Sequence, residues 1–183
     1  MIKINRPAFL FLCLLLPALL CAQSNVPEFG QVSTDELKLN SYPGDTSAPA
    51  FVVYDIGEAA FIPFDAGFEV LYTRRKRIKI LKKQGIYMAE LRIPVYSSGK
   101  NKDKLISLEA YTYNLTDGGI TKVALDQSAI YEQKLSDWYY LKKVAFPDVR
   151  EGSVIEFRYH VQSPWIMHLQ EWYFYQFYIS QFY

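Results

Sequence analysis

Apolar and polar residues alternate over many short stretches of the chain, a pattern that predicts β-strands with one buried face. Residues 154–161 show it most clearly, because Ile155, Phe157 and Tyr159 alternate there with polar side chains. Further strands are predicted at residues 51–56, 59–64, 68–81, 87–95, 105–115, 120–125, 138–146 and 172–183. Seven or more short strands separated by turn residues are typical of an all-β fold, here an antiparallel β-sandwich or a curved open sheet.

Two connections in this pattern are informative. Gly57 and Glu58 are predicted to form the turn of a hairpin between the first two strands. Residues 128–134 fit a short helix and an irregular strand equally well.

The part of the chain before residue 50 does not alternate in this way. Residues 23–30 form a polar lead-in that we expect to be a flexible arm. Ser33 and Glu36 have the spacing of a capping box, so a helix of one or two turns is expected to begin after Ser33. We therefore predict a linker with a short helix at 23–49 and a β-sandwich domain at 50–183.

Residues 1–22 have the composition of a secretory signal peptide. Lys3 and Arg6 supply positive charge, residues 8–20 are almost wholly apolar, and Ala22 offers a small residue at the cleavage point. The apolar run is also short for a membrane span. The sequence thus predicts an exported protein, periplasmic or extracellular, that meets a membrane only during export.

Both cysteines of the chain, Cys13 and Cys21, lie inside this leader. After cleavage no thiol remains, so we expect no disulfide, no cysteine nucleophile and no cysteine-bound metal. A lipid anchor on Cys21 is disfavoured, because Leu20 stands where lipidation requires a small residue.

Charge and aromatic content narrow the classes of function. The 20 basic side chains fall to 18 once Lys3 and Arg6 are removed, against 19 acidic ones. A nearly neutral chain lacks the broad basic face of a nucleic-acid binder and the basic cluster of a membrane-surface protein. The 15 Tyr, 12 Phe and 3 Trp favour strands, because aromatic residues fit a pleated, half-buried surface.

Residues 74–83 hold the densest positive charge, with Arg or Lys at seven positions. Such a cluster could bind an anionic polymer or phosphate. In a strand, however, successive side chains point to opposite faces, so the charges divide between two sides. We favour the interpretation that they protect an exposed sheet edge from pairing with other chains.

Candidate chemistry is sparse. The two histidines, His160 and His168, do not have the spacing of a zinc site, and His160 falls on the polar face of its strand. We recognise no serine, histidine and carboxylate set and no glycine-rich phosphate loop. The sequence therefore predicts no catalytic residue, no cofactor and no metal.

Aromatic residues in the last third of the chain are the strongest candidates for a partner surface. The group consists of Trp138, Tyr139, Tyr140, Trp165, Trp172, Tyr173 and Phe174. Such rings can stack on sugars, although alternation explains most of them as core residues. The candidate ligand or partner surface that we retain is Trp138, Tyr140, Trp165 and Trp172.

Several stretches together point to a known family. They are residues 32–37, 50–55, 74–81 followed by Gly85, 108–114, 145–149 and 151–159. The most specific is the turn at Phe146 and Pro147 followed by Gly-Ser-Val-Ile-Glu at 152–156. From about Val32 to its end, the chain resembles the domain of unknown function that precedes transglutaminase-like domains in exported bacterial proteins, chiefly of the Bacteroidetes type.

This resemblance implies a mostly antiparallel β fold, similar to the N-terminal β domain of zinc aminopeptidases. In full-length relatives the downstream transglutaminase-like domain would supply a cysteine, histidine and aspartate triad, and none of these residues carries over to this chain. Relatives usually continue beyond an aromatic strand such as 172–177. We therefore expect this chain to be a fragment or a truncated product.

Our leading hypothesis is a non-catalytic accessory module of an exported transglutaminase-like protein, which recognises a polypeptide or a glycan for the catalytic domain. One alternative is an outer-membrane β-barrel, favoured by the aromatic alternation that ends at Tyr183 and opposed by charges such as Arg75 and Arg77 within a strand. Another is a free-standing carbohydrate-binding module that uses Trp165 and Trp172.

Overall fold

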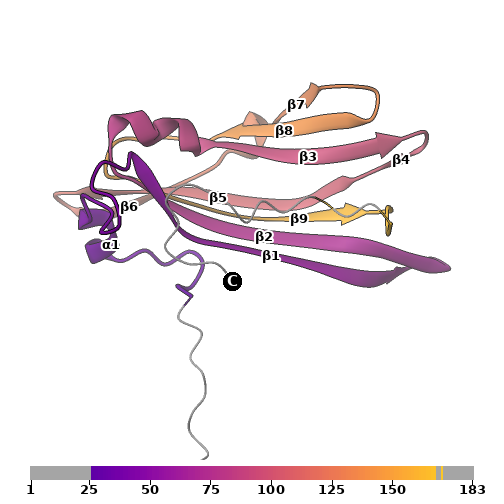
Figure 1. Cartoon of the computed structure of the whole chain (residues 1–183), viewed down its shortest axis with the longest axis horizontal. Helices are drawn as coiled ribbons and strands as arrows, with labels where there is room; N and C mark the ends of the chain where they lie inside the picture. Colours follow the sequence, from indigo (N-terminus) through magenta and orange to yellow (C-terminus); the bar gives the residue numbers. More distant parts are fainter. Residues whose placement is uncertain (1–25, 168–169, 171–183) are drawn as a thin grey trace, which may run out of the picture.

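The computed structural model describes residues 26–167 and Gln170 (Figure 1). Its strands form two antiparallel sheets, one of them curled like half a barrel. The predicted all-β fold, with a curved sheet and a short N-terminal helix, is confirmed.

The larger sheet has five strands in the order β1-β2-β9-β5-β6. Their bounds are Ala50–Phe64 (β1), Gly67–Ile80 (β2), Val154–Ser163 (β9), Lys104–Thr116 (β5) and Gly119–Ala124 (β6). β1 and β2 form one long hairpin, and Asp65 in its turn has a φ of 49°, in the left-handed region that Asp tolerates. β9 lies between β2 and β5, so the centre of this sheet joins distant parts of the sequence.

The smaller sheet has four strands in the order β4-β3-β8-β7 and lies over the larger one (Figure 1). Their bounds are Asn101–Lys102 (β4), Glu90–Ser98 (β3), Tyr139–Ala145 (β8) and Tyr131–Lys134 (β7). The 3-10 helix η1 (Lys83–Ala89) connects β2 to β3, and η2 (Gln127–Ala129) precedes β7.

The main core lies between the two sheets. We call the face of the larger sheet that points into this core the inner face, and the opposite one the outer face. The core side chains include Val52, Ile78, Ile155 and Phe157 from the larger sheet and Leu91, Ile93 and Val144 from the smaller one. Each fully buried side chain of this kind stabilises the fold by roughly 1.5–3 kcal/mol.

The short helix α1 (Thr34–Lys38) begins where the capping box predicted it. The hydroxyl of Ser33 accepts a hydrogen bond from the backbone N–H of Glu36 at 3.1 Å. The Ser33 half of the capping box is therefore formed.

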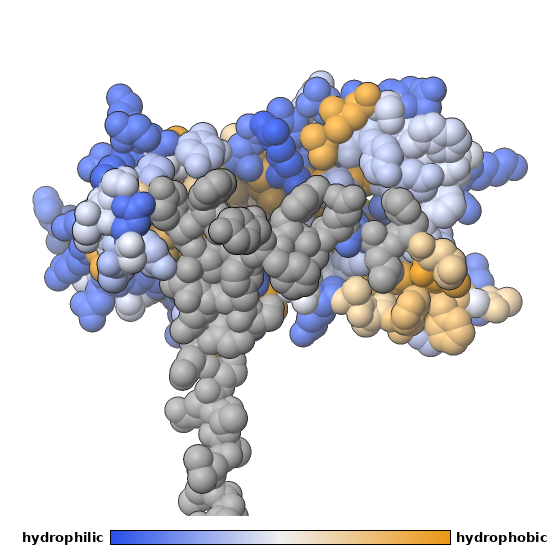
Figure 2. Space-filling model, in the orientation of Figure 1, coloured by the Kyte–Doolittle hydropathy of each residue, from blue (hydrophilic) through white to orange (hydrophobic). Residues whose placement is uncertain are grey.

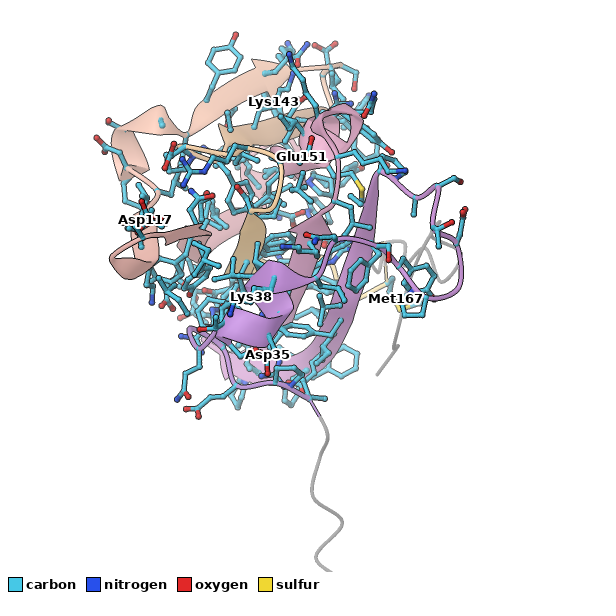
Figure 3. The ribbon with its side chains drawn as sticks, turned by 90° about the vertical axis from the view of Figure 1, so that its left-hand side faces the viewer. Asp35, Lys38, Asp117, Lys143, Glu151 and Met167 are labelled. Atoms are coloured by element: carbon cyan, nitrogen blue, oxygen red, sulfur yellow. The ribbon has the colours of Figure 1, made fainter. Side chains whose placement is uncertain are left out.

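The N-terminal segment covers part of the outer face of the larger sheet. Leu37 of α1 packs there against Tyr113 and Val154. Figure 3 shows the layers from one end, with Lys143 in the smaller sheet and Lys38 of α1 on the far side of the larger one.

The structure corrects several predictions of local structure. Residues 51–56 and 59–64 form one continuous strand instead of a hairpin, because β2 pairs with β1 along its whole length and the turn comes only at Asp65. Residues 87–89 belong to η1, so β3 begins later than predicted. The ambiguous stretch 128–134 contains both the end of η2 and the strand β7. The predicted strand 172–183 lies outside the described residues.

The pairing of β1 with β2 is irregular at one position. Val52 pairs with Ile78 and Tyr54 pairs with Arg77, so Val53 is the extra residue of a β-bulge.

Candidate functional site

The cations of residues 74–79 do not protect a sheet edge. β2 is an interior strand, paired with β1 on one side and with β9 on the other, so the interpretation as edge protection is wrong. The predicted division between two faces is confirmed: Arg74 and Lys76 lie on the inner face, and Arg77 and Lys79 lie on the outer face.

A first group of charges, which we call the outer cluster, consists of Glu36, Tyr54, Arg77, Lys79 and Glu156. Nη2 of Arg77 lies 2.6 Å from Oε1 of Glu156, and both side chains are almost fully buried. The hydroxyl of Tyr54 donates a hydrogen bond to the same carboxylate oxygen. Burial, together with the Glu156 carboxylate, raises the pKa of Tyr54, so this phenol stays a hydrogen-bond donor.

The N-terminal segment contributes directly to the outer cluster. Nη1 of Arg77 lies 3.1 Å from Oε2 of Glu36, and Nη2 donates to the carbonyl of Glu28 at 2.8 Å. The backbone N–H of Gly30 donates to Oε2 of Glu156, also at 2.8 Å. Residues 26–30 are therefore not a free arm, because their backbone is bound to buried charges.

Lys79 completes the outer cluster and has no acidic partner in contact among the described residues. Its Nζ donates to the carbonyls of Leu37 and Gly152, both at 2.6 Å. Burial lowers the pKa of Lys79 to about 8, although the charge of Glu36 opposes the shift. With two cations and two carboxylates, the outer cluster is balanced in charge, and its contacts hold α1 and the segment before it on the sheet.

A second group of charges, which we call the cleft cluster, consists of Asp55, Arg74 and Lys76 on the inner face. Asp55 is fully buried and accepts two hydrogen bonds from Arg74, from Nε at 2.9 Å and from Nη2 at 2.7 Å. Nζ of Lys76 lies 3.1 Å from Oδ2 of the same carboxylate. Burial, and to a smaller extent the neighbouring Arg74, lowers the pKa of Lys76, whereas Asp55 opposes the shift.

The cleft cluster opens onto a cavity of about 410 Å³ between β2, η1 and β3. Arg74 and Lys76 line it together with apolar and aromatic side chains and with a second charged group from β3. These other lining residues are Ile78, Tyr87, Met88, Leu91, Phe146 and Phe157, and Glu90 and Arg92. Glu90 is in turn paired with Arg92 at 3.0 Å and with Lys143 at 2.9 Å.

The predicted aromatic residues that the structure describes have different neighbours. Trp165 packs edge-on against Tyr96, with ring centroids 5.1 Å apart, and the ring centroid of Tyr139 lies 5.2 Å from that of Tyr96. Tyr140 lies under the ammonium of Lys102, 4.2 Å from its ring centroid.

Of the remaining predicted aromatic residues, Trp138 is half exposed and lies just before β8. Trp172 lies outside the described residues. Trp165 and Tyr139 thus both contact Tyr96, whereas Tyr140 contacts the ammonium group of Lys102.

The sequence predicted no zinc site at the two histidines. Nδ1 of His160 lies 2.8 Å from the hydroxyl of Ser107, and His168 lies outside the described residues. Within 26–167 and Gln170, no group of three or more His, Cys, Asp or Glu side chains gathers as a metal site requires. The same part of the chain contains no helix long and apolar enough to cross a membrane.

Sequence reasoning missed Asp55 altogether and treated Arg74 and Lys76 as part of one undivided charge cluster. The available signal was the one acidic residue within the otherwise apolar stretch 51–56. Its partners could not be identified, because the pairing of Asp55 with Lys76 depends on where the hairpin turns.

Comparison with known proteins gives two matches. A family model described as "Domain of Unknown Function with solved-structure structure (DUF3857)" matches residues 68–178. Among solved structures, a "putative protease" from Parabacteroides distasonis ATCC 8503 is similar, with a TM-score of 0.47 and 17% sequence identity. The match covers 63% of this chain and 23% of that one, so the chain spans about a quarter of that protein's length. No curated protein matches the chain.

Proposed function

The chain belongs to the DUF3857 family of domains of unknown function, and we propose that it is a non-catalytic accessory module of an exported protein. In this role the module docks onto a transglutaminase-like domain and recognises a polypeptide for that domain. The family match confirms the resemblance stated from the sequence. The accessory role, the export and the partner are our proposals.

The observation that carries this proposal is the apolar end of the β1–β2 hairpin. Phe61 and Phe68 each keep 63% of their surface exposed, and Phe64 keeps 41%. In Figure 2 a hydrophobic area covers this end of the hairpin. Neighbouring exposed apolar side chains of this kind mark sites of interaction with other proteins.

The position of this apolar end suits docking. β9 pairs with β2 only as far as Val70, so the residues between Phe61 and Glu69 form a two-stranded projection beyond the rest of the sheet. Because the end of the hairpin projects from the sheet, a second domain can contact it without any movement of the two sheets. The backbone of the hairpin is fixed by its own pairing, so docking requires little ordering.

We propose a polypeptide partner rather than a glycan. Sugar stacking needs an exposed ring face, whereas Trp165 is only partly exposed and packs against Tyr96 at an interplanar angle of 79°. The exposed rings at the hairpin end suit a protein surface better.

The test is a binding measurement with the full chain and a purified transglutaminase-like domain from a family member, by isothermal titration calorimetry. Phe61→Ser, Phe64→Ser and Phe68→Ser combined should weaken binding at least tenfold. The matched control replaces two exposed apolar residues elsewhere, Ile106→Ser and Tyr131→Ser, and should bind like the unmodified chain.

Two outcomes would contradict the proposal. One is equal binding by the triple hairpin variant and the unmodified chain, which would show that the hairpin end is not the docking surface. The other is turnover of a peptide, ester or glycoside substrate by the purified chain alone, abolished by a point substitution, which would show that the module is catalytic.

A further inference from the structure

The larger sheet has a long open edge at β1. Within the described residues β1 pairs with β2 alone, so one side of this 15-residue strand has no neighbouring strand (Figure 1). The other edge strands are short and each carries a lysine: β6 has six residues with Lys122, β7 has four with Lys134, and β4 has two with Lys102. Short length and lysines keep an edge from pairing with another chain. β1 is long and contains no Lys or Arg, so it lacks this protection.

Residues 56–62 are the accessible part of this edge. Near the start of β1, Tyr42 stacks on Phe51 with ring centroids 5.3 Å apart, whereas residues 58–61 are all exposed. Glu58 is the one charged side chain within 56–62. A long edge with so little charge is a template for a further strand.

The hydrogen bonds that this edge offers follow from the geometry of the hairpin. Phe64 and Gly67 flank the two-residue turn and pair with each other, so their N–H and C=O groups bond across the hairpin. Along an antiparallel strand such residues alternate with residues whose N–H and C=O groups point to the other side. Gly57, Ala59 and Phe61 therefore direct their backbone groups to the open edge.

The sequence of this edge is complementary to a second copy of itself. In an antiparallel pair about a two-fold axis at Ala59, Gly57 of each copy lies opposite Phe61 of the other, and Glu58 lies opposite Ala60. An aromatic ring opposite a glycine covers the backbone that the glycine leaves open. Each carboxylate faces a small apolar side chain, so no two like charges lie directly opposite each other.

Neighbouring registers are less favourable. An axis at Glu58 would place the two Glu58 carboxylates opposite each other, which is destabilising. An axis at Ala60 would place Pro63 opposite Gly57, and the missing N–H of proline would lose a hydrogen bond of the ladder. The edge therefore specifies one register, with its axis at Ala59.

We propose that β1 of one copy pairs with β1 of a second copy, antiparallel about Ala59, so that two of the larger sheets join into one continuous sheet. The same patch of both copies forms the contact, as in most symmetric dimers. Residues 56–62 of each copy make up the whole contact, so the dimer is weak and forms as the protein concentration rises. The proposal does not rest on docking at the hairpin end, of which only Phe61 belongs to the paired stretch.

The experiment measures sedimentation and amide hydrogen exchange of the purified chain over a series of concentrations. We expect a reversible equilibrium between monomer and dimer. The amides of Gly57, Ala59 and Phe61 should become protected from exchange as the dimer forms. The amides of Glu58 and Ala60, which already bond within the hairpin, should change little.

Two variants that add the same charge at adjacent exposed positions test the register. Ala59→Lys places two ammonium groups opposite each other on the axis, and it should weaken the dimer at least tenfold. Ala60→Lys places each ammonium group opposite Glu58 of the other copy, and it should strengthen the dimer at least twofold. A general effect of net charge would move both variants in the same direction. Thermal unfolding checks that both variants fold.

Three results would overturn the proposal. They are a chain that stays monomeric over the whole series, an equal shift of dimerisation in the two lysine variants, and protection of the three amides only after a transglutaminase-like domain is added. The last would identify the docking partner as the occupant of the edge.

The two proposals fail in different measurements. Ala59 lies outside the apolar end of the hairpin, so Ala59→Lys should bind the transglutaminase-like domain like the unmodified chain. Phe64 and Phe68, which the docking test replaces, lie outside the paired stretch. Failure of docking and failure of dimerisation are therefore distinguishable.

Discussion

β2 carries two buried groups of charges, one on each face, and they differ in how the charges are balanced and closed off. In the outer cluster, Arg77 and Lys79 face Glu36 and Glu156, and the N-terminal segment covers them. In the cleft cluster, one carboxylate serves two cations beside an open cavity. The outer cluster therefore fixes the N-terminal segment on the sheet, whereas the cleft cluster borders a cavity that solvent enters.

The largest effect is expected from Glu156→Gln in the outer cluster. The substitution leaves the guanidinium of Arg77 buried without its closest carboxylate, and it should lower the free energy of unfolding by about 3–5 kcal/mol. Urea denaturation measures this. Glu109→Gln, which removes an exposed ion pair with Arg158, is the control and should cost less than about 1 kcal/mol. Similar losses of unfolding free energy in the two variants would contradict the expectation that the buried ion pair contributes more than the exposed one.

Asp55→Asn should be the next most damaging change. Two cations then lack their shared carboxylate, but both are partly in contact with solvent, so we expect a loss of about 2–3 kcal/mol. The loss should shrink as the salt concentration is raised, because ions reach the open cavity. The loss in Glu156→Gln should not shrink in this way. Equal salt dependence of the two losses would break the contrast between an open and a covered cluster.

The pH dependence of stability should reveal Lys79. The unfolded chain keeps the proton of this lysine up to a pKa near 10.5, whereas the folded chain releases it at about 8. Between these values the unfolded state binds more protons, so raising the pH favours the folded state, by roughly 2 kcal/mol from pH 8 to 10. Lys79→Met should flatten most of this rise, with a smaller part remaining from Lys76, whose pKa is also lowered.

Above pH 10 the trend should reverse. Burial raises the pKa of both Tyr54 and Tyr113, so these phenols ionise first in the unfolded chain. The folded state then binds more protons, and stability is lost as the pH rises through this range. A stability curve that falls steadily from pH 8 would contradict the burial of Lys79 as a charged group.

The smallest effect is expected from Lys76→Met in the cleft cluster. The change removes one of two cations that share a carboxylate, so the free energy of unfolding should stay constant or rise by up to about 1 kcal/mol. Arg75→Gln should lie within about 0.5 kcal/mol of the unmodified chain. A loss well above 1 kcal/mol in Lys76→Met alone would show that Lys76 is part of a balanced pair, and the comparison of the two clusters would fail.

Local rules predicted a good share of this fold. Alternation located β9 and β5 closely, and the spacing of Ser33 and Glu36 located α1. Alternation also divided the cations of β2 between two faces, because that depends only on neighbouring residues. These features are encoded within a few residues of one another.

The sites could not be predicted in the same way, because they depend on contacts between distant residues. Gly30 binds Glu156 across 126 positions, and Arg77 binds it across 79. Gly57 resembles a turn residue, yet it lies within β1, since long pairing with β2 outweighs a local turn preference. Because the turn was misplaced, the partner of Asp55 could not be identified.

The bulge at Val53 determines to which face of the sheet each later side chain of β1 points. Without this bulge Val53 would pair with Arg77, Tyr54 would exchange sides with Asp55, and each cluster would receive the wrong group at once. The extra residue in this strand, more than the identity of one side chain, decides which side of the sheet carries the acid and which carries the phenol.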